Sequence, residues 1–316
     1  MIENRRSFIV GLKSTFLQSK EKQFLKKYKP WGIILFSRNI KSIVQTKKLT
    51  DNIRKIFNDK KYPILIDQEG GRINRLNNLI DSSHFTGEFF GNLFKKNNQK
   101  FNIYCKIFVN QTCYLLNRIG VNINTVPVLD VRRKNSNNVI GNRSFDSNPK
   151  TVSKIGDYFI DQFHKNNIAT VIKHIPGHGL AKVDSHKFTP IVKSKLKDLN
   201  KIDFLAFRNK KSLFAMTAHI IYQNIDNKFT ATHSKEVVKL IKKKIKFKNL
   251  LISDDISMKG LKFTVKENTI KAFNAGCDLV LHCNAKYGEM IAVAKNSPKV
   301  NTFITKKTSQ FYKILS

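Results

Sequence analysis

Short apolar runs rich in β-branched residues recur along the chain and alternate with longer amphipathic stretches. Within each run the hydrophobic residues are continuous instead of alternating with polar ones. Such continuity is typical of strands that are buried on both faces of a parallel sheet. The runs cover residues 7–12, 31–36, 62–67, 120–128, 168–174, 212–219, 249–254 and 277–283. The pattern therefore predicts eight parallel strands.

The stretches between these runs have helical periodicity. The clearest covers residues 97–118, and further helices are expected at residues 18–28, 44–57, 151–166, 196–209, 234–246, 265–275 and 287–295. Strand and helix alternate through the chain without a long Pro-, Gly- or Ser-rich linker, which predicts a single (β/α)8 barrel domain over residues 1–316. An open, doubly wound sheet is the alternative, but no glycine-rich dinucleotide fingerprint follows the first strand.

The composition is that of a soluble protein with a sizeable core. Hydrophobic residues make up 41% of the 316 residues. No apolar run approaches the roughly 18 residues that a membrane-spanning helix needs. The apolar segment 8–12 is too short for a secretion signal and is followed by Lys13. We therefore expect a cytoplasmic protein with no membrane partner, in which the four cysteines are buried thiols and not disulfides.

The net charge of +36 raises the question of a nucleic-acid partner. The lysines are spread over the whole chain together with asparagine, isoleucine and phenylalanine, which is typical of a compositional bias and not of a binding groove. The one dense run, residues 239–248, has the pattern of an amphipathic helix with a solvated lysine face. We expect incidental binding of polyanions at most, and no dedicated nucleic-acid partner.

Titratable residues stand at the carboxyl ends of five of the predicted strands. They are Asp67, Lys173 with His174, His219, Asp254 and His282. In a parallel barrel these strand ends converge on one face, which is where active sites of such barrels are built. The pattern therefore predicts a polar site on that face, in which His219 and His282 can equally be packing residues of the barrel rim.

The segment KHIPGHGLAKVDSH, residues 173–186, is rich in histidine and glycine and follows the fifth strand. His174 and His178 have the spacing of zinc ligands on a helix, but Pro176 between them excludes a helix. A phosphate-binding loop would need a Lys-Ser/Thr pair opening a helix, which is absent from the segment. A loop that carries an acid–base pair, Asp184 and His186, remains, because residues two apart in an extended segment project to the same side. A surface loop with unrelated histidines is the alternative.

Five segments together resemble the signature segments of glycoside hydrolase family three, in its single-domain bacterial β-N-acetylglucosaminidase branch. They are DQEGGRINR, IGNRSF, KHIPGHG with DSH, MTAHI and LISDDISM, in family order between Trp31 and Cys283. The resemblance implies a (β/α)8 barrel and retaining hydrolysis of terminal β-linked N-acetylglucosamine. It also implies a cytoplasmic role in cell-wall recycling, with 1,6-anhydro-N-acetylmuramic acid muropeptides as substrates. We expect no cofactor, no metal and a monomer.

The resemblance also implies roles for single residues. Asp254, the first aspartate of SDD, is at the position of the nucleophile. His186 is at that of the general acid/base, and Asp184 is its partner. The sugar-binding positions are Asp67, Arg75, Arg143, Lys173 and His174. This set suits the chemistry, because retention needs an attacking carboxylate and a group that first donates and later accepts a proton.

The residues alone leave alternatives open. Asp255 is a second candidate for the nucleophile, because adjacent strand residues point to opposite faces. The aspartate pair could also support attack by the substrate's own acetamido group. The alternative functions are a family-three β-glucosidase and a catalytically idle barrel binding protein with incidental binding of polyanions or nucleic acid. The intact set of Asp184, His186 and Asp254 disfavours the idle barrel.

Overall fold

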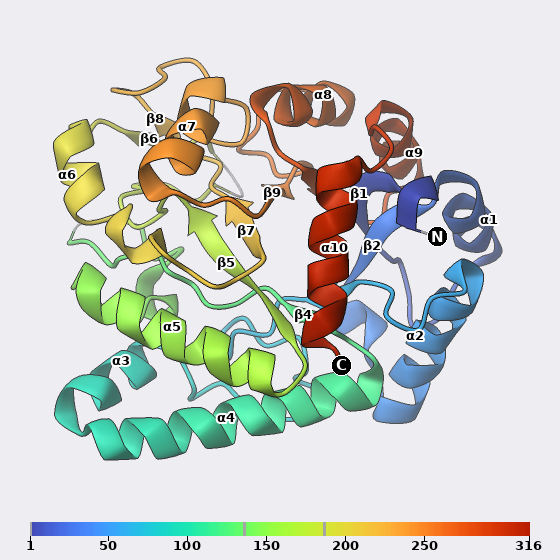
Figure 1. Ribbon diagram of the computed structural model, residues 1–316, viewed down its shortest axis with the longest axis horizontal. Coiled ribbons are helices and arrows are strands. Elements are labelled where there is room, and N and C mark those ends of the chain that lie inside the picture. Colours follow the sequence, from blue (N-terminus) through green and yellow to red (C-terminus); the bar gives the residue numbers. More distant parts are fainter. Residues whose placement is uncertain (1, 135–136, 186–187) are drawn as a thin grey trace.

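The chain folds into a closed barrel of eight parallel strands in a computed structural model that describes residues 2–134, 137–185 and 188–316 (Figure 1). The order around the barrel is β1-β10-β9-β7-β5-β4-β3-β2. The strands are β1 (Arg6–Gly11), β2 (Pro30–Leu35), β3 (Ile64–Ile66), β4 (Ile123–Asn124), β5 (Ala169–Ile175), β7 (Phe214–Thr217), β9 (Leu250–Asp255) and β10 (Leu279–His282). The predicted (β/α)8 barrel is confirmed, and each strand lies at one of the eight apolar runs.

Strand β4 is much shorter than the apolar run that predicts it. Only Ile123 and Asn124 form the ladder with β3 and β5. Pro127 has no N–H to donate, so the ladder stops before it and resumes only as an isolated bridge between Val128 and Lys173. The chain beyond β4 therefore runs along the end of β5 and brings its following residues to the same face of the barrel.

Helices surround the barrel, and Figure 1 shows α4 and α5 side by side along one edge. The helices are α1 (Ser19–Tyr28), α2 (Ile43–Phe57), α3 (Gly87–Lys96), α4 (Asn98–Ile119), α5 (Pro149–Lys165), α6 (Leu196–Lys201), α7 (Lys235–Leu240), α8 (Val265–Ala275), α9 (Tyr287–Asn296) and α10 (Thr302–Ile314). Among the described residues, none of these helices is both long and apolar enough to cross a bilayer.

The predicted helix at 265–275 has the same bounds in the structure because both of its ends are set locally. Thr264 and Glu267 form a reciprocal capping box at the start of α8. Gly276 ends the helix with φ of 108°, a conformation that glycine adopts without steric cost. Sequence signals that lie within a few residues of each other thus fix this element.

Two helical predictions need correction, and two helices were not predicted. The predicted helix at 196–209 ends at Lys201, because the buried Asp203 pairs with Arg133 (2.6 Å between Oδ2 and Nη2) and the chain turns there. The helix predicted at 234–246 changes from α7 into a π-helical turn over Ile241–Ile245. Helices α3 and α10 have no counterpart in the prediction.

Helix α10 closes the amino-terminal end of the barrel. Trp31 at the start of β2, Phe214 at the start of β7 and Phe311 of α10 have ring centroids 5.6 to 6.5 Å apart. The Trp31 indole N–H donates to Thr308 Oγ1 of α10 (2.9 Å), which satisfies a buried donor. Helix α10 therefore covers this end of the barrel.

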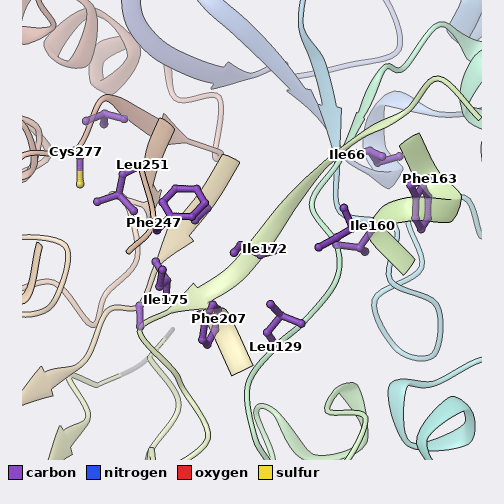
Figure 2. Packing of buried hydrophobic residues seen from close by; sticks show 14 of the residues in the cluster. Ile66, Leu129, Ile160, Phe163, Ile172, Ile175, Phe207, Phe247, Leu251 and Cys277 are labelled. Atoms are coloured by element: carbon purple, nitrogen blue, oxygen red, sulfur yellow. The ribbon is translucent and has the colours of Figure 1, made fainter. Parts of the chain in front are cut away.

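A second layer of apolar packing holds the helices to the outside of the strands. Figure 2 shows Ile172 of β5 and Leu129, with Ile160 and Phe163 of α5 to their right, and all four belong to one buried apolar cluster. All four side chains are fully buried or nearly so. This packing fixes β5, and with it the two polar residues at its carboxyl end, Lys173 and His174.

Candidate active site

A cavity of about 140 Å³ lies at the carboxyl ends of the barrel strands. It contains six of the eight predicted site residues: Asp67, Arg75, Arg143, Lys173, His174 and Asp254. They come from four places in the chain, namely the segment after β3, the 3-10 turn Gly141–Arg143, the end of β5 and the end of β9. The fold thus brings together side chains that are up to 187 residues apart, the difference between positions 67 and 254.

The two remaining predicted residues belong to the loop after β5. Asp184 is half-buried on this loop, and its neighbour Ser185 lines the cavity. His186 lies outside the described residues. Of the predicted acid–base pair, the structure therefore places Asp184 alone.

Lys173 is the centre of a buried polar network in the cavity floor. Its ammonium group lies 3.2 Å from Asp67 Oδ1, 2.6 Å from Glu69 Oε1 and 2.9 Å from Thr125 Oγ1. Thr125 also donates a short hydrogen bond to Asp67. The Lys173 side chain is 3% exposed, so these contacts replace its hydration.

Asp67 keeps its charge despite its position. Burial alone would raise the pKa of its carboxyl group, but the Lys173 and Arg75 cations and the Thr125 hydroxyl more than offset this effect and leave the pKa below its ordinary value. A carboxylate that is ionised and partly exposed to a cavity is an acceptor for hydroxyl groups of a ligand. Asp67 can therefore accept hydrogen bonds from a polar ligand in the cavity.

Glu69 is a residue of the site that sequence reasoning missed. Its carboxylate receives two parallel hydrogen bonds from Arg143, from Nε and Nη2 at 2.8 Å each, in addition to the contact with Lys173. These cations hold the pKa of Glu69 well below its usual range against the opposing effect of burial. Glu69 thus orients two predicted sugar-binding residues at once. It lies within the DQEGGRINR segment, two positions after the strand-end aspartate.

Asp130 is a second residue that sequence reasoning missed. It is fully buried and accepts hydrogen bonds from the backbone N–H groups of His174 (3.2 Å) and His178 (2.6 Å). Its other oxygen lies 2.7 Å from His174 Nδ1, which leaves Nε2 of that ring on the side away from Asp130. The signal was available, because Asp130 follows the apolar run 120–128 just as Asp67 follows β3.

The adjacent aspartates at the end of β9 have different surroundings, although both line the cavity. Asp255 Oδ1 accepts hydrogen bonds from Ser257 N (3.0 Å), Ser257 Oγ (2.8 Å) and Cys283 N (3.2 Å). Its carboxylate therefore ties the turn after β9 to the end of β10. Asp254 Oδ1 accepts a hydrogen bond from Asp255 N (2.7 Å), which lies within the last two residues of β9.

His219 and His282 are packing residues of the rim. His219 is fully buried, with Nε2 donating to the Asp255 carbonyl oxygen (2.9 Å) and Nδ1 2.7 Å from Thr232 Oγ1. His282 is also fully buried, and its Nε2 lies 3.0 Å from Glu289. Both rings hold loops together. Within residues 2–134, 137–185 and 188–316, no group of three or more His, Cys, Asp or Glu side chains is arranged to hold a metal ion.

The buried charge network predicts a stability difference between two similar substitutions. Glu69→Gln leaves Arg143 and Lys173 without their shared counter-charge, and we expect a loss of about 3 kcal/mol in the free energy of unfolding. Glu88→Gln removes the partner of Arg132 in a more exposed pair, with side chains 30% and 39% exposed, and should cost less than about 1 kcal/mol. Urea denaturation measures both. Equal small losses would mean that the network contributes little to folding.

The geometry of the site by itself indicates a class of protein. Ionised carboxylates and cations converge in one cavity on the carboxyl face of a (β/α)8 barrel, which is the arrangement of an enzyme that acts on a polar small molecule. The sequence model for the glycosyl hydrolase family 3 N-terminal domain matches residues 9–308, and the chain belongs to this family. It is a glycoside hydrolase.

Known proteins agree with this assignment over most of the chain. A β-hexosaminidase of Tolumonas auensis is 31% identical over 278 residues, which cover 86% of this chain and 81% of the relative. A β-hexosaminidase of Haemophilus influenzae is 32% identical over 291 residues, covering 89% and 80%. The solved structure of NagZ from Neisseria gonorrhoeae in complex with N-trifluoroacetyl-D-glucosamine superimposes with a TM-score of 0.83 at 25% identity, over 99% of each chain. NagZ from the same organism in complex with zinc ion gives a TM-score of 0.85 at 26% identity, over 98% of this chain and 90% of the other.

Proposed function

We propose that this glycoside hydrolase is a retaining β-N-acetylglucosaminidase that releases terminal β-linked N-acetylglucosamine. The observation that carries the proposal is the single cavity in which Asp254 faces the same space as Asp67, Arg143 and Lys173. Relatives named β-hexosaminidase and a structural neighbour bound to an N-acylated glucosamine support the choice of sugar. We further propose that the natural substrates are 1,6-anhydro-N-acetylmuramic acid muropeptides and that the enzyme acts in the cytoplasm.

In the proposed reaction, the terminal sugar lies in the cavity with its anomeric carbon next to Asp254. The Arg143 guanidinium donates hydrogen bonds to sugar hydroxyls, and the Asp67 carboxylate, which Lys173 holds in place, accepts them. The Asp254 carboxylate attacks the anomeric carbon while His186 protonates the departing oxygen. A water molecule then attacks the anomeric carbon and displaces the Asp254 carboxylate, while His186 removes a proton from the water. The product therefore keeps the β configuration.

The surroundings of the two aspartates support Asp254 as the nucleophile over Asp255. Asp255 Oδ1 is engaged by three donors that hold the turn after β9. This engagement gives Asp255 a structural role at the end of the barrel. The Asp254 carboxylate lines the cavity and is oriented by the neighbouring backbone N–H at the end of β9, which is the preorganisation that a nucleophile needs.

The choice of sugar is tested by comparing two chromogenic substrates. We expect kcat/KM for the 4-nitrophenyl β-N-acetylglucosaminide to exceed that for the 4-nitrophenyl β-glucoside, because the similarity is to proteins that act on or bind acylated amino sugars. Equal or reversed preference would place the enzyme with family-three β-glucosidases. A folded protein that cleaves neither substrate would favour the alternative of a catalytically idle binding protein.

The reaction as proposed uses no metal, which gives a further prediction. Proton transfer and nucleophilic attack are assigned to side chains, so dialysis against EDTA should leave turnover of the aryl N-acetylglucosaminide unchanged. Enzyme dialysed without chelator is the control. A loss of activity with EDTA that added Zn²⁺ restores would overturn the assignment of the acid–base step to His186 and Asp184.

A further inference from the structure

A chain of buried hydrogen bonds connects the floor of the cavity to the loop between β5 and β6 (Ile191–Val192). Asp130 Oδ1 accepts a hydrogen bond from the backbone N–H of His178 (2.6 Å), and His178 Nε2 lies 3.1 Å from Ser185 Oγ. Asp130 is fully buried, and His178 and Ser185 are each 3% exposed. This chain of hydrogen bonds therefore ends at Ser185, which lies between Asp184 and position 186 in the sequence.

His178 is suited to a structural role in this chain because it stays neutral. Burial, and secondarily the neighbouring His174 ring and Arg143 cation, lower the pKa of His178 to about 4, although Asp130 and Asp254 act in the opposite direction. Near neutral pH the ring is uncharged, and its hydrogen bond with Ser185 does not depend on a proton exchanged with solvent.

Backbone packing holds the same loop from both sides. A Cβ atom on Gly179 would lie 1.8 Å from the Val131 carbonyl oxygen, and one on Gly260 would lie 2.1 Å from the Ser185 carbonyl oxygen. Both glycines therefore permit an approach that no other residue allows without a shift. The loop is packed between the segment after β4 and the turn after β9, both of which contribute to the cavity.

We propose that Ser185 is a positioning residue of the acid–base step, and that its hydrogen bond with His178 fixes the backbone next to Asp184, one residue before position 186 in the sequence. The proposal rests on the proposed function, because it requires the loop to deliver a proton to the leaving group. Ser185 itself takes no part in bond making or breaking. Its loss should therefore affect the proton transfers that need an accurately placed acid or base, and the first step only where the leaving group must be protonated.

The test is the effect of Ser185→Ala on two substrates that differ in their need for protonation. In this scheme kcat/KM reports the first step, in which the leaving group departs. For a disaccharide of N-acetylglucosamine we expect kcat/KM to fall by about tenfold or more, a part of the roughly 10²–10⁴ that general acid catalysis contributes. For the 4-nitrophenyl glycoside, whose leaving group departs nearly unaided, we expect a change of less than about threefold.

Two controls separate positioning from a general effect of losing a buried hydroxyl. Ser212→Ala removes a fully buried serine that bonds the Thr170 carbonyl oxygen (2.6 Å) at the other end of the barrel, and should change both substrates in parallel. Introduced into His186→Gly, Ser185→Ala should have no further effect on the disaccharide, because the group that it positions is gone.

Each outcome decides the proposal. Equal losses on both substrates, or full additivity with His186→Gly, would overturn it while leaving the proposed function intact. A folded wild-type protein that cleaves neither N-acetylglucosaminide would overturn the proposed function and the role of Ser185 with it. If Ser185→Ala does not fold, His178→Gln and His178→Leu decide instead. Only the glutamine can still hydrogen-bond Ser185, so it should retain the higher ratio of disaccharide to aryl glycoside activity.

Discussion

His186→Gly is expected to lose about 10²–10⁴-fold in kcat/KM on a disaccharide of N-acetylglucosamine, the usual contribution of general acid–base catalysis. A sugar hydroxyl must be protonated as its bond breaks, whereas a nitrophenolate leaves nearly unaided. The first step with the 4-nitrophenyl glycoside should therefore be much less affected. Its second step should then limit turnover, because the same residue activates water. Steady-state and burst kinetics on the two substrates measure this difference.

Azide provides a check on the same variant. It needs no base, so added azide should restore turnover of the aryl glycoside by His186→Gly and give the β-glycosyl azide. Asp254→Gly is the matched control, which should have neither the leaving-group dependence nor a β-configured product. Equal losses of His186→Gly on both substrates, together with no effect of azide, would mean that the histidine does not transfer protons.

Asp254→Ala is expected to lower kcat on every substrate by roughly 10⁴–10⁶-fold, the scale on which removal of a nucleophile acts in other covalent enzymes. The loss should be independent of the leaving group, because the attacking carboxylate is needed for each substrate. Unfolding measurements should find the variant nearly as stable as the wild type.

Asp255→Asn is the control for this comparison. It weakens the hydrogen bonds from Ser257 and Cys283 that hold the turn after β9, and should reduce stability more than it reduces kcat on an activated substrate. If Asp255→Asn loses as much activity as Asp254→Ala while remaining folded, the assignments of the two residues are wrong.

Much of the fold could be predicted because the signals are local. Continuous apolar runs marked the strands, and capping residues such as Thr264 and Gly276 set helix ends. Helix α10 was missed, although the Asn301 side chain caps its first turn by accepting from Ile304 N. This helix is held by contacts with the barrel. One of them is the hydrogen bond between Thr308 and the Trp31 indole, two residues that are 277 positions apart in the sequence. Tertiary packing of this kind leaves little trace in a local pattern.

The site was predicted in part for the same reason. Strand ends identified Asp67 and His174, and the family resemblance added Arg75 and Arg143. Glu69 was missed because it does not end a strand, and its importance arises from two cations that only the fold brings to it. The choice between Asp254 and Asp255 as the nucleophile likewise could not be made from the sequence, because the donors that surround each carboxylate come from the fold.

The central claim is that Asp254 attacks the anomeric carbon of an N-acetylglucosaminyl donor, and trapping of the covalent intermediate tests it most directly. The wild-type protein is incubated with a 5-fluoro N-acetylglucosaminyl donor that forms the intermediate faster than it is hydrolysed, then digested and analysed by mass spectrometry. We predict one added glycosyl group, located on Asp254. A label on Asp255, or no label in a protein that turns over the aryl N-acetylglucosaminide, would contradict the claim.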